Sequence, residues 1–346
     1  MKDDDLAVGT HGRGFWILDD IAPLRQMDAK VSQSEAFLFK PQTALRIRWD
    51  MNPDTPVPPD EPAGQNPPEG AILDYYLGTD VSGPVTLEIF DAAGKSVRRY
   101  SSADVVRPLD NSVLDVPAYW ARAPRGLSGA AGMHRFLWDL HLPSMPYARP
   151  TLPMQAIQHD TAPAPTSPWV LPGSYTVKLT ANGKTYAQPL MVKMDPRVKT
   201  SLPGLTQQYT LSKQIYDDAV ASANSLEHLR VLREQIGKLQ DRGAVAEFEK
   251  SLQSVGGSAG GRFGGGGRGA APGPDTLASV HGSLVQLLTV FQEADVAPTA
   301  SQAAAAADRR RAMAKLMQQW KALVDQELPK VNVRLKQANL QPLTVE

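Results

Sequence analysis

Apolar and polar residues alternate along the stretch from Pro84 to Val192. This is the period-two pattern of strands that bury one face. The segments that carry it are Val85–Phe90, Lys95–Tyr100, His134–Leu140, Gly173–Thr180 and Lys184–Val192. Asn182-Gly183 predicts a type I′ hairpin, because both central residues of that turn must tolerate positive φ. Several short strands separated by turn residues are typical of a β-sandwich.

Shorter strand candidates precede this stretch: Leu6–Gly9, Phe15–Leu18, Ala36–Phe39, Ala44–Trp49 and Ala71–Leu77. Thr10–Gly14 separates the first two as a glycine-rich turn. Two strands alone are marginal in water, so we expect the first pair to be cut from a larger sheet. The proline-rich segments 52–70 and 142–172 predict irregular loops between strands.

From Leu205 the apolar spacing changes to three and four residues, which predicts a helix of about 35 residues. Ala244–Leu252 extends or restarts this helix after Gly243. Leu277–Phe291 and Met313–Leu328 repeat the pattern, and Pro329 predicts a kink or a stop. The stripes indicate about three or four antiparallel helices in a helical bundle. The segment 256–274 is mostly glycine and is interpreted as a disordered loop.

Composition narrows the possible functions. The chain has 346 residues, enough for two or three domains. The chain contains 36 Lys and Arg residues and 36 Asp and Glu residues, so its net charge is zero. A neutral chain offers no electrostatic argument for binding nucleic acid or an anionic membrane. The absence of cysteine excludes thiol catalysis, thiolate metal sites and disulfides. No apolar run is long enough to cross a bilayer, and Met1–Asp5 is acidic where a signal peptide would be basic.

Four short matches to catalytic motifs fail the structural context that each motif requires. Residues 256–260 match G-x-S-x-G, but a predicted helix precedes them where a nucleophile elbow needs a strand. Residues 264–269 match G-x-G-x-x-G inside a glycine tract, without a preceding strand. Gly94-Lys-Ser96 and Gly183-Lys-Thr185 lack the first glycine of a phosphate loop and are interpreted as hairpin turns.

Several polar residues remain as candidates. Asp139 and His141 could share a metal, but zinc needs three or four ligands, so we predict a structural role for them and no metal or cofactor. Asp20, which follows Asp19, is interpreted as a turn cap before Ile21. His11 and Arg13 in the glycine turn are the candidate binding residues, because loops carry binding residues and arginine presents a fork for carboxylate or phosphate. No catalytic residue is predicted.

Residues 5–25, DLAVGTHGRGFWILDDIAPLR, resemble the closing segment of large secreted bacterial β-propeller proteins. These are the sortilin-like proteins with neuraminidase-type (BNR) repeats, often labelled glycosyl hydrolase. Further segments that match the pattern of this family are Leu38–Pro41, Gly70–Leu77, Gly132–Leu140 and Pro172–Leu179. The central stretch is also similar to the immunoglobulin-like domain of flagellar hook-capping proteins.

The resemblance implies a multidomain β plus α chain. Residues 1–25 would be the last strands of a truncated propeller, 26–40 a linker, 41–195 an immunoglobulin-like antiparallel β-sandwich and 200–346 an antiparallel helical bundle. It implies a periplasmic or secreted protein whose partners are the upstream propeller blades, with another protein or a glycan as a further candidate partner. The Ser/Thr-x-Asp-x-Gly-x-Thr-Trp turn of the repeats is not present, so no catalytic residue is carried over.

Two functions follow from this resemblance. The preferred one is a non-catalytic accessory region, structural or binding, of the propeller protein. The alternative is part of a sialidase-like glycoside hydrolase whose active site lies in the upstream propeller. A pair of carboxylates about 5–10 Å apart in a pocket of this chain would favour the enzyme.

Overall fold

The computed structural model is described for residues 4–12, 14–48, 67–106, 108, 110, 112, 114, 117–148, 151–152, 160–239, 242–257 and 274–345. It divides into two compact units. The β unit comprises Met1–Pro143, Arg149–Pro165 and Trp169–Lys199, and the helical unit comprises Ser144–Ala148, Thr166–Pro168 and Thr200–Glu346. The chain is therefore a β plus α protein, as the hydrophobic pattern predicts.

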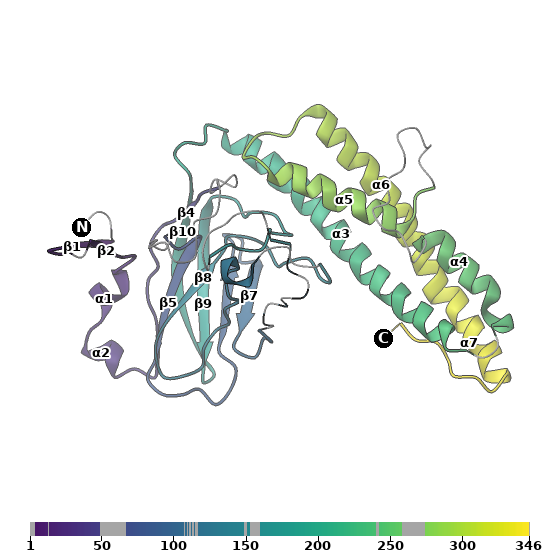
Figure 1. The fold of residues 1–346 in the computed structure, drawn as a ribbon, viewed down its shortest axis with the longest axis horizontal. Coiled ribbons are helices and arrows are strands. Elements are labelled where there is room, and N and C mark those ends of the chain that lie inside the picture. The colour runs from purple at the N-terminus through teal and green to yellow at the C-terminus, as the bar shows by residue number, and fades with distance from the viewer. Residues whose placement is uncertain are drawn as a thin grey trace. The chain divides into compact units, whose positions relative to one another are not determined.

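The β unit begins with the two predicted strands, β1 (Leu6–Gly9) and β2 (Phe15–Leu18), which pair antiparallel as a two-stranded sheet (Figure 1). Within the described residues, no third strand joins this pair. Two short helices follow, α1 (Ala22–Gln26) and α2 (Ala29–Ser32). The side chain of Asp28 caps α2 by accepting a hydrogen bond from Val31 N at 2.8 Å.

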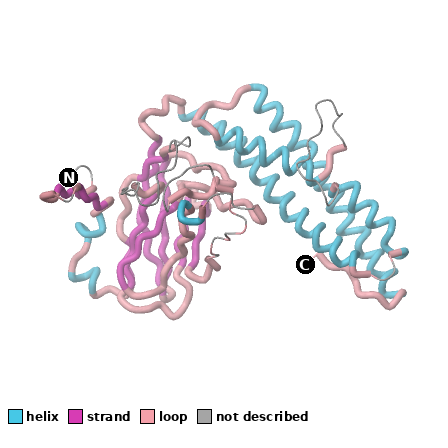
Figure 2. The backbone as a smooth tube through the Cα atoms, in the orientation of Figure 1, coloured by secondary structure: helices cyan, strands magenta, loops and turns pink. Residues whose placement is uncertain are grey.

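Two larger sheets form the body of the β unit (Figures 1 and 2). The five-stranded sheet has the order β4 (Ala44–Arg46), β10 (Lys184–Met194), β9 (Gly173–Ala181), β6 (Thr86–Phe90), β7 (Ser96–Ser101). The three-stranded sheet has the order β3 (Ala36–Leu38), β5 (Ala71–Leu77), β8 (Gly132–Trp138). All pairings are antiparallel except that of β4 with β10. A 3-10 turn, η1 (Ala118–Trp120), lies between β7 and β8.

The structure corrects one predicted boundary. Residues 26–40 do not form a linker throughout, because Ala36–Leu38 pairs with Leu77–Tyr75 of β5 and buries Ala36 and Leu38. The strand predicted from Ala44 is confirmed to Arg46. The strand candidate Ala36–Phe39 is confirmed over Ala36–Leu38, so the structure corrects the extent of the linker and not the strand.

Alternating side chains of the two sheets meet in a common core. Trp138 lies 5.6 Å from Tyr175 and Phe136 lies 4.5 Å from Tyr100, measured between ring centroids. The fully buried side chains of these strands include Leu73, Leu77, Leu87, Ile89, Val177 and Leu179. Asn182 at φ 50° and Gly183 at φ 73° confirm the predicted type I′ turn between β9 and β10.

The helical unit is built around α3 (Leu202–Gly237), whose 36 residues confirm the predicted long helix. After η2 (Gly243–Val245), α4 (Ala246–Gly256) and α5 (Leu277–Gln292) run back along α3, while α6 (Ala300–Ala322) runs parallel to it (Figure 1). A π-helical turn, η3 (Leu323–Glu327), leads into α7 (Leu328–Gln337). Pro329 does not stop this helix. Proline has no N–H to donate four residues back, and the π turn accommodates that loss.

Buried polar contacts set how α5 lies against α3. The Gln208 amide donates to the carbonyls of Phe291 and Ala294 at 2.6 and 2.5 Å. One turn further along α3, Gln292 donates to the Ser212 hydroxyl at 2.8 Å. These bonds pair the start of α3 with the end of α5, so a shift of one helical turn would leave buried polar groups unsatisfied. No helix among the described residues combines the length and the apolar character needed to span a membrane.

Candidate functional site

The N-terminal hairpin exposes apolar side chains on both of its faces. Cross-strand pairs share a face, so the pairing Leu6↔Leu18 and Val8↔Trp16 defines one face, and Ala7↔Ile17 and Gly9↔Phe15 define the other. All eight residues are exposed. The exposed fraction reaches 87% for Phe15, 66% for Ile17 and 65% for Trp16. Apolar side chains of this size are normally covered, which makes the hairpin a candidate docking surface.

The turn of the hairpin closes on Gly14. Both the backbone N–H and the hydroxyl of Thr10 donate to the Gly14 carbonyl at 3.1 Å. Gly12 and Gly14 have φ values of 77° and 84°, a left-handed conformation that favours glycine. His11, one of the two predicted binding residues, is exposed in this turn. Arg13, the other, lies outside the described residues, and a binding role for the pair stays a prediction.

The stem of the hairpin, in contrast, is held by polar contacts around the buried residues Asp20 and Ile21. Ile21 N donates to the Asp4 carbonyl at 2.7 Å, and Asp20 N donates to the Asp5 carboxylate at 3.0 Å. The carboxylate of Asp20 accepts from Ala22 N at 2.9 Å, which confirms the predicted turn cap. Asp20 is 5% exposed and adopts a φ of 53°. These contacts fix the chain direction where it leaves β2.

Arg135 on β8 joins this stem to the three-stranded sheet. Its guanidinium donates to both carboxylate oxygens of Asp74 at 3.0 and 3.1 Å. The same group donates to the carbonyls of Asp19 and Asp20 at 2.7 and 2.8 Å. Gln42 adds a bond of 2.5 Å from its amide to the Asp20 carboxylate. We refer to Asp20, Gln42, Asp74 and Arg135 as the stem cluster.

Charge compensation within the stem cluster explains how Asp74 tolerates its burial. Asp74 is 5% exposed, and burial raises the pKa of its carboxyl while the hydrogen bond from Arg135 acts in the opposite direction. Sequence reasoning missed both residues. One signal was available: Asp74 is the single charge in the apolar strand Ala71–Leu77, and a buried charge requires a partner.

The histidines singled out in the sequence have structural surroundings. His141 Nδ1 lies 2.8 Å from the Asp139 carbonyl, and its ring lies 4.0 Å from that of Trp169. Burial lowers the pKa of His141. His134 Nε2 bonds to the Ala130 carbonyl at 2.7 Å. No cluster of three potential metal ligands occurs among the residues that the structure describes.

Besides Arg230, which bonds to Glu227 and Glu234 of its own helix, two further arginines among the described residues each bond to a pair of carboxylates. In the β unit, Arg122 bonds to Asp160 at 2.7 Å and to Glu69 at 3.0 Å. In the helical unit, Arg309 bonds to Asp308 at 2.5 Å and to Asp275 at 3.0 Å. In each pair a single guanidinium bonds to both carboxylates, so both are engaged in ion pairs within the chain.

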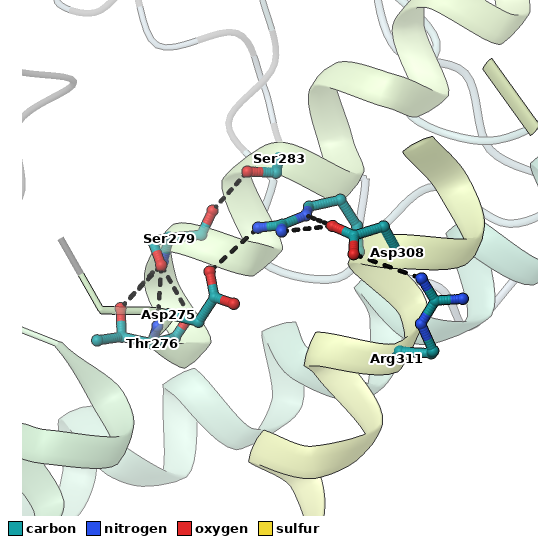
Figure 3. Close-up of polar contacts among 7 residues, drawn as sticks. Asp275, Thr276, Ser279, Ser283, Asp308 and Arg311 are labelled. Carbon is teal, nitrogen blue, oxygen red and sulfur yellow. Dashed lines mark hydrogen bonds and ion pairs between the residues drawn. The ribbon is translucent and has the colours of Figure 1, made fainter. Parts of the chain in front are cut away.

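The pair at Arg309 lies beside a groove of about 930 Å³ between α4, α5 and α6, which is lined by both polar and apolar residues. Figure 3 shows that its hydroxyl groups are engaged within the helix itself. Thr276 N donates to the Ser279 hydroxyl at 2.9 Å, and the Ser283 hydroxyl donates to the Ser279 carbonyl at 2.9 Å. These bonds cap and support the first turns of α5, which is the ordinary role of Thr and Ser at a helix start.

Comparisons of the chain with protein-family models, with curated proteins and with solved structures returned no match. The resemblance to sortilin-like propeller proteins and the expected periplasmic or secreted location therefore stay predictions. The function must be argued from the hairpin and its stem.

Proposed function

We propose that this chain is a non-catalytic accessory region of a secreted or periplasmic β-propeller protein, and that its hairpin is part of the last propeller blade. One observation carries the proposal: the hairpin exposes apolar side chains on both faces, while hydrogen bonds from Arg135 of the three-stranded sheet hold its stem. The hairpin is therefore held in place at its stem, while no other part of the described chain packs on its two strands. The blade that precedes it in a longer protein would supply that cover.

The exposed apolar area of the hairpin distinguishes between the partners that could cover it, a second copy of this chain or a propeller blade. At about 200 Å² for each large apolar residue, the exposed fractions of the hairpin amount to roughly 700 Å², split between the two faces. A second copy packed on one face would bury only about 800 Å² in total, below the roughly 1,200 Å² of a stable interface. A propeller blade packs between neighbouring blades and so is covered on both faces. The propeller is therefore the occupant that fits the hairpin.

The strand order supports the finer assignment of the β unit as an immunoglobulin-like sandwich. The consecutive strands β3 and β4 belong to different sheets, and the two sheets pack face to face through Trp138 and Tyr175. For the helical unit, the alternating directions of α3, the α4–α5 pair and α6 support a helical bundle. Both assignments belong to the proposal.

The alternative, a glycoside hydrolase, would place its chemistry in the propeller. In the described residues, the carboxylate pairs at Arg122 and Arg309 are ion-paired structural groups. We therefore propose that this chain contributes a structural support and a binding surface to its parent protein, whichever reaction that parent performs.

Hydrogen exchange tests the proposal. In the purified chain, amides of Leu6–Leu18 should exchange much faster than those of Val85–Phe90, because the strands lack a cover. The same amides should become protected in the longer protein that contains the propeller. Equal protection of the two segments in the monomeric chain would contradict the proposal.

An activity assay tests the non-catalytic part. The purified chain should not hydrolyse a panel of aryl glycosides and aryl esters. Turnover that disappears when a residue of this chain is mutated would show that the chain is an enzyme.

A further inference from the structure

The stem cluster contains one side chain whose hydrogen bonds are divided between the hairpin and the sheet. Two bonds from Arg135 go to Asp74, its direct cross-strand neighbour on β5. Two more go to the main-chain carbonyls of Asp19 and Asp20, the residues that follow β2. A guanidinium is planar and rigid, so binding both oxygens of one carboxylate sets the direction of its remaining N–H groups. Asp74 thereby aims Arg135 at the stem.

The acceptors on the hairpin side are equally constrained. Asp20 is buried, has a φ of 53°, and holds Ala22 N and the Gln42 amide through its own carboxylate. Its carbonyl cannot turn away from Arg135 without disturbing these bonds. The apolar strands Leu6–Gly9 and Phe15–Leu18 contribute no buried side chain that could hold the hairpin instead. The direction of the hairpin thus depends on its stem, where the stem cluster acts together with the buried side chain of Ile21 and the ion pair between Arg25 and Asp4.

We propose that Arg135 is a positioning residue that fixes the direction of the hairpin relative to the β unit, so that the docking surface is already oriented before a partner binds. Preorganisation of this kind lowers the ordering cost of association. The identity of the partner rests on the proposed function, whereas the orienting role of Arg135 does not. It follows that the β unit would be held at a set angle to the propeller.

The variant that removes the link without leaving either member of the Asp74–Arg135 ion pair alone is Asp74→Val with Arg135→Val. The two residues are paired in register, so two valines form an ordinary apolar cross-strand pair. Replacing both partners of a buried ion pair is tolerated far better than removing one. Arg135→Lys is the second variant, because a lysine keeps the charge near Asp74 but lacks the planar fork.

A matched control exists in the same unit. Arg122 also joins two segments through two carboxylates, Asp160 and Glu69, away from the stem. Arg122→Lys should weaken a comparable ion-pair network without changing the hairpin. Because the chain contains no cysteine, cysteines introduced at two positions report on those positions alone.

The experiment places spin labels at His11→Cys in the hairpin turn and Ala92→Cys in the turn between β6 and β7, both exposed. Pulsed electron spin resonance then gives the distribution of distances between the labels. We expect a narrow distribution in the parent chain and in Arg122→Lys. In both stem variants we expect a distribution at least twice as wide, while hydrogen exchange in β9 shows that the β unit is folded.

Equal widths in the parent and in the double valine variant would overturn the positioning role. If Arg135→Lys fails to fold, the double variant still decides the question. The outcome is separable from the proposed function. Hairpin amides that stay exposed in the longer protein would refute the propeller assignment, and the label distances would still report on Arg135.

Discussion

Truncating one phenylalanine in the hairpin and one in the core gives a direct measure of how little the hairpin strands contribute to this chain. Phe136 is 7% exposed and packs against Tyr100, so Phe136→Ala should cost about 3–5 kcal/mol. Phe15 is 87% exposed. Scaling the same loss to its buried remainder gives roughly 0.5 kcal/mol for Phe15→Ala. The two substitutions delete the same atoms, so the difference between them reports burial alone.

The assay is native-state hydrogen exchange at the slowest amides of β9. This strand lies between β10 and β6, so its amides open only when the whole β unit unfolds. The free energy from these amides should fall by about 3–5 kcal/mol in Phe136→Ala and by less than about 1 kcal/mol in Phe15→Ala. A loss of 2 kcal/mol or more in Phe15→Ala would refute the reasoning. It would mean that the hairpin packs within the chain.

Four further predictions concern single positions. Burial lowers the pKa of His281 below the usual value of about 6.5, so the unfolded state binds the proton first as pH falls. The stability of the helical unit should be full above pH ~6.5 and decline below it, and urea titrations of helical circular dichroism should show a smaller decline in His281→Gln. Gly94→Ala, at φ 76° in open space, should cost about 1–2 kcal/mol by exchange in β9. Gly70→Ala should cost more, because its Cβ would lie 2.1 Å from the Trp138 carbonyl oxygen. Gln208→Leu leaves the buried carbonyl of Phe291 and the part-buried carbonyl of Ala294 without their donor, and it should cost about 1–3 kcal/mol. An unchanged midpoint of thermal unfolding would count against this prediction.

Elements with a local cause were predictable from the sequence. The type I′ turn at Asn182-Gly183 depends on two residues that tolerate positive φ, and the structure has it. The helix α3 follows from a stripe repeated over many turns. The turn cap at Asp20 needs only a carboxylate two residues before an amide. In each case the controlling interactions lie within a few residues along the chain.

Pairings between distant segments were not predictable in this way. The residues Ala36–Phe39 predict a strand by themselves, but its partner β5 lies far along the chain, so its place in the three-stranded sheet could not be predicted. Arg135 and Asp74 are 61 residues apart, and Arg135 and Asp20 are 115 apart. A period-two pattern of apolar residues shows which side chains share one face of a strand. It does not show which other strand lies opposite. The stem cluster therefore became visible only when the three segments were placed together.

The sequence by itself determined the division into a strand-rich and a helix-rich part, the turns, and which side chains of each element are apolar. It could not determine which apolar side chains are covered. Val85–Phe90 and Phe15–Leu18 are both short apolar strand segments in the sequence, yet Ile89 is fully buried and Ile17 is 66% exposed. An apolar pattern expresses the preference of side chains for leaving water, whereas burial also requires a second surface. Only the tertiary structure supplies that surface for the core strands, and among the described residues it supplies none for the hairpin.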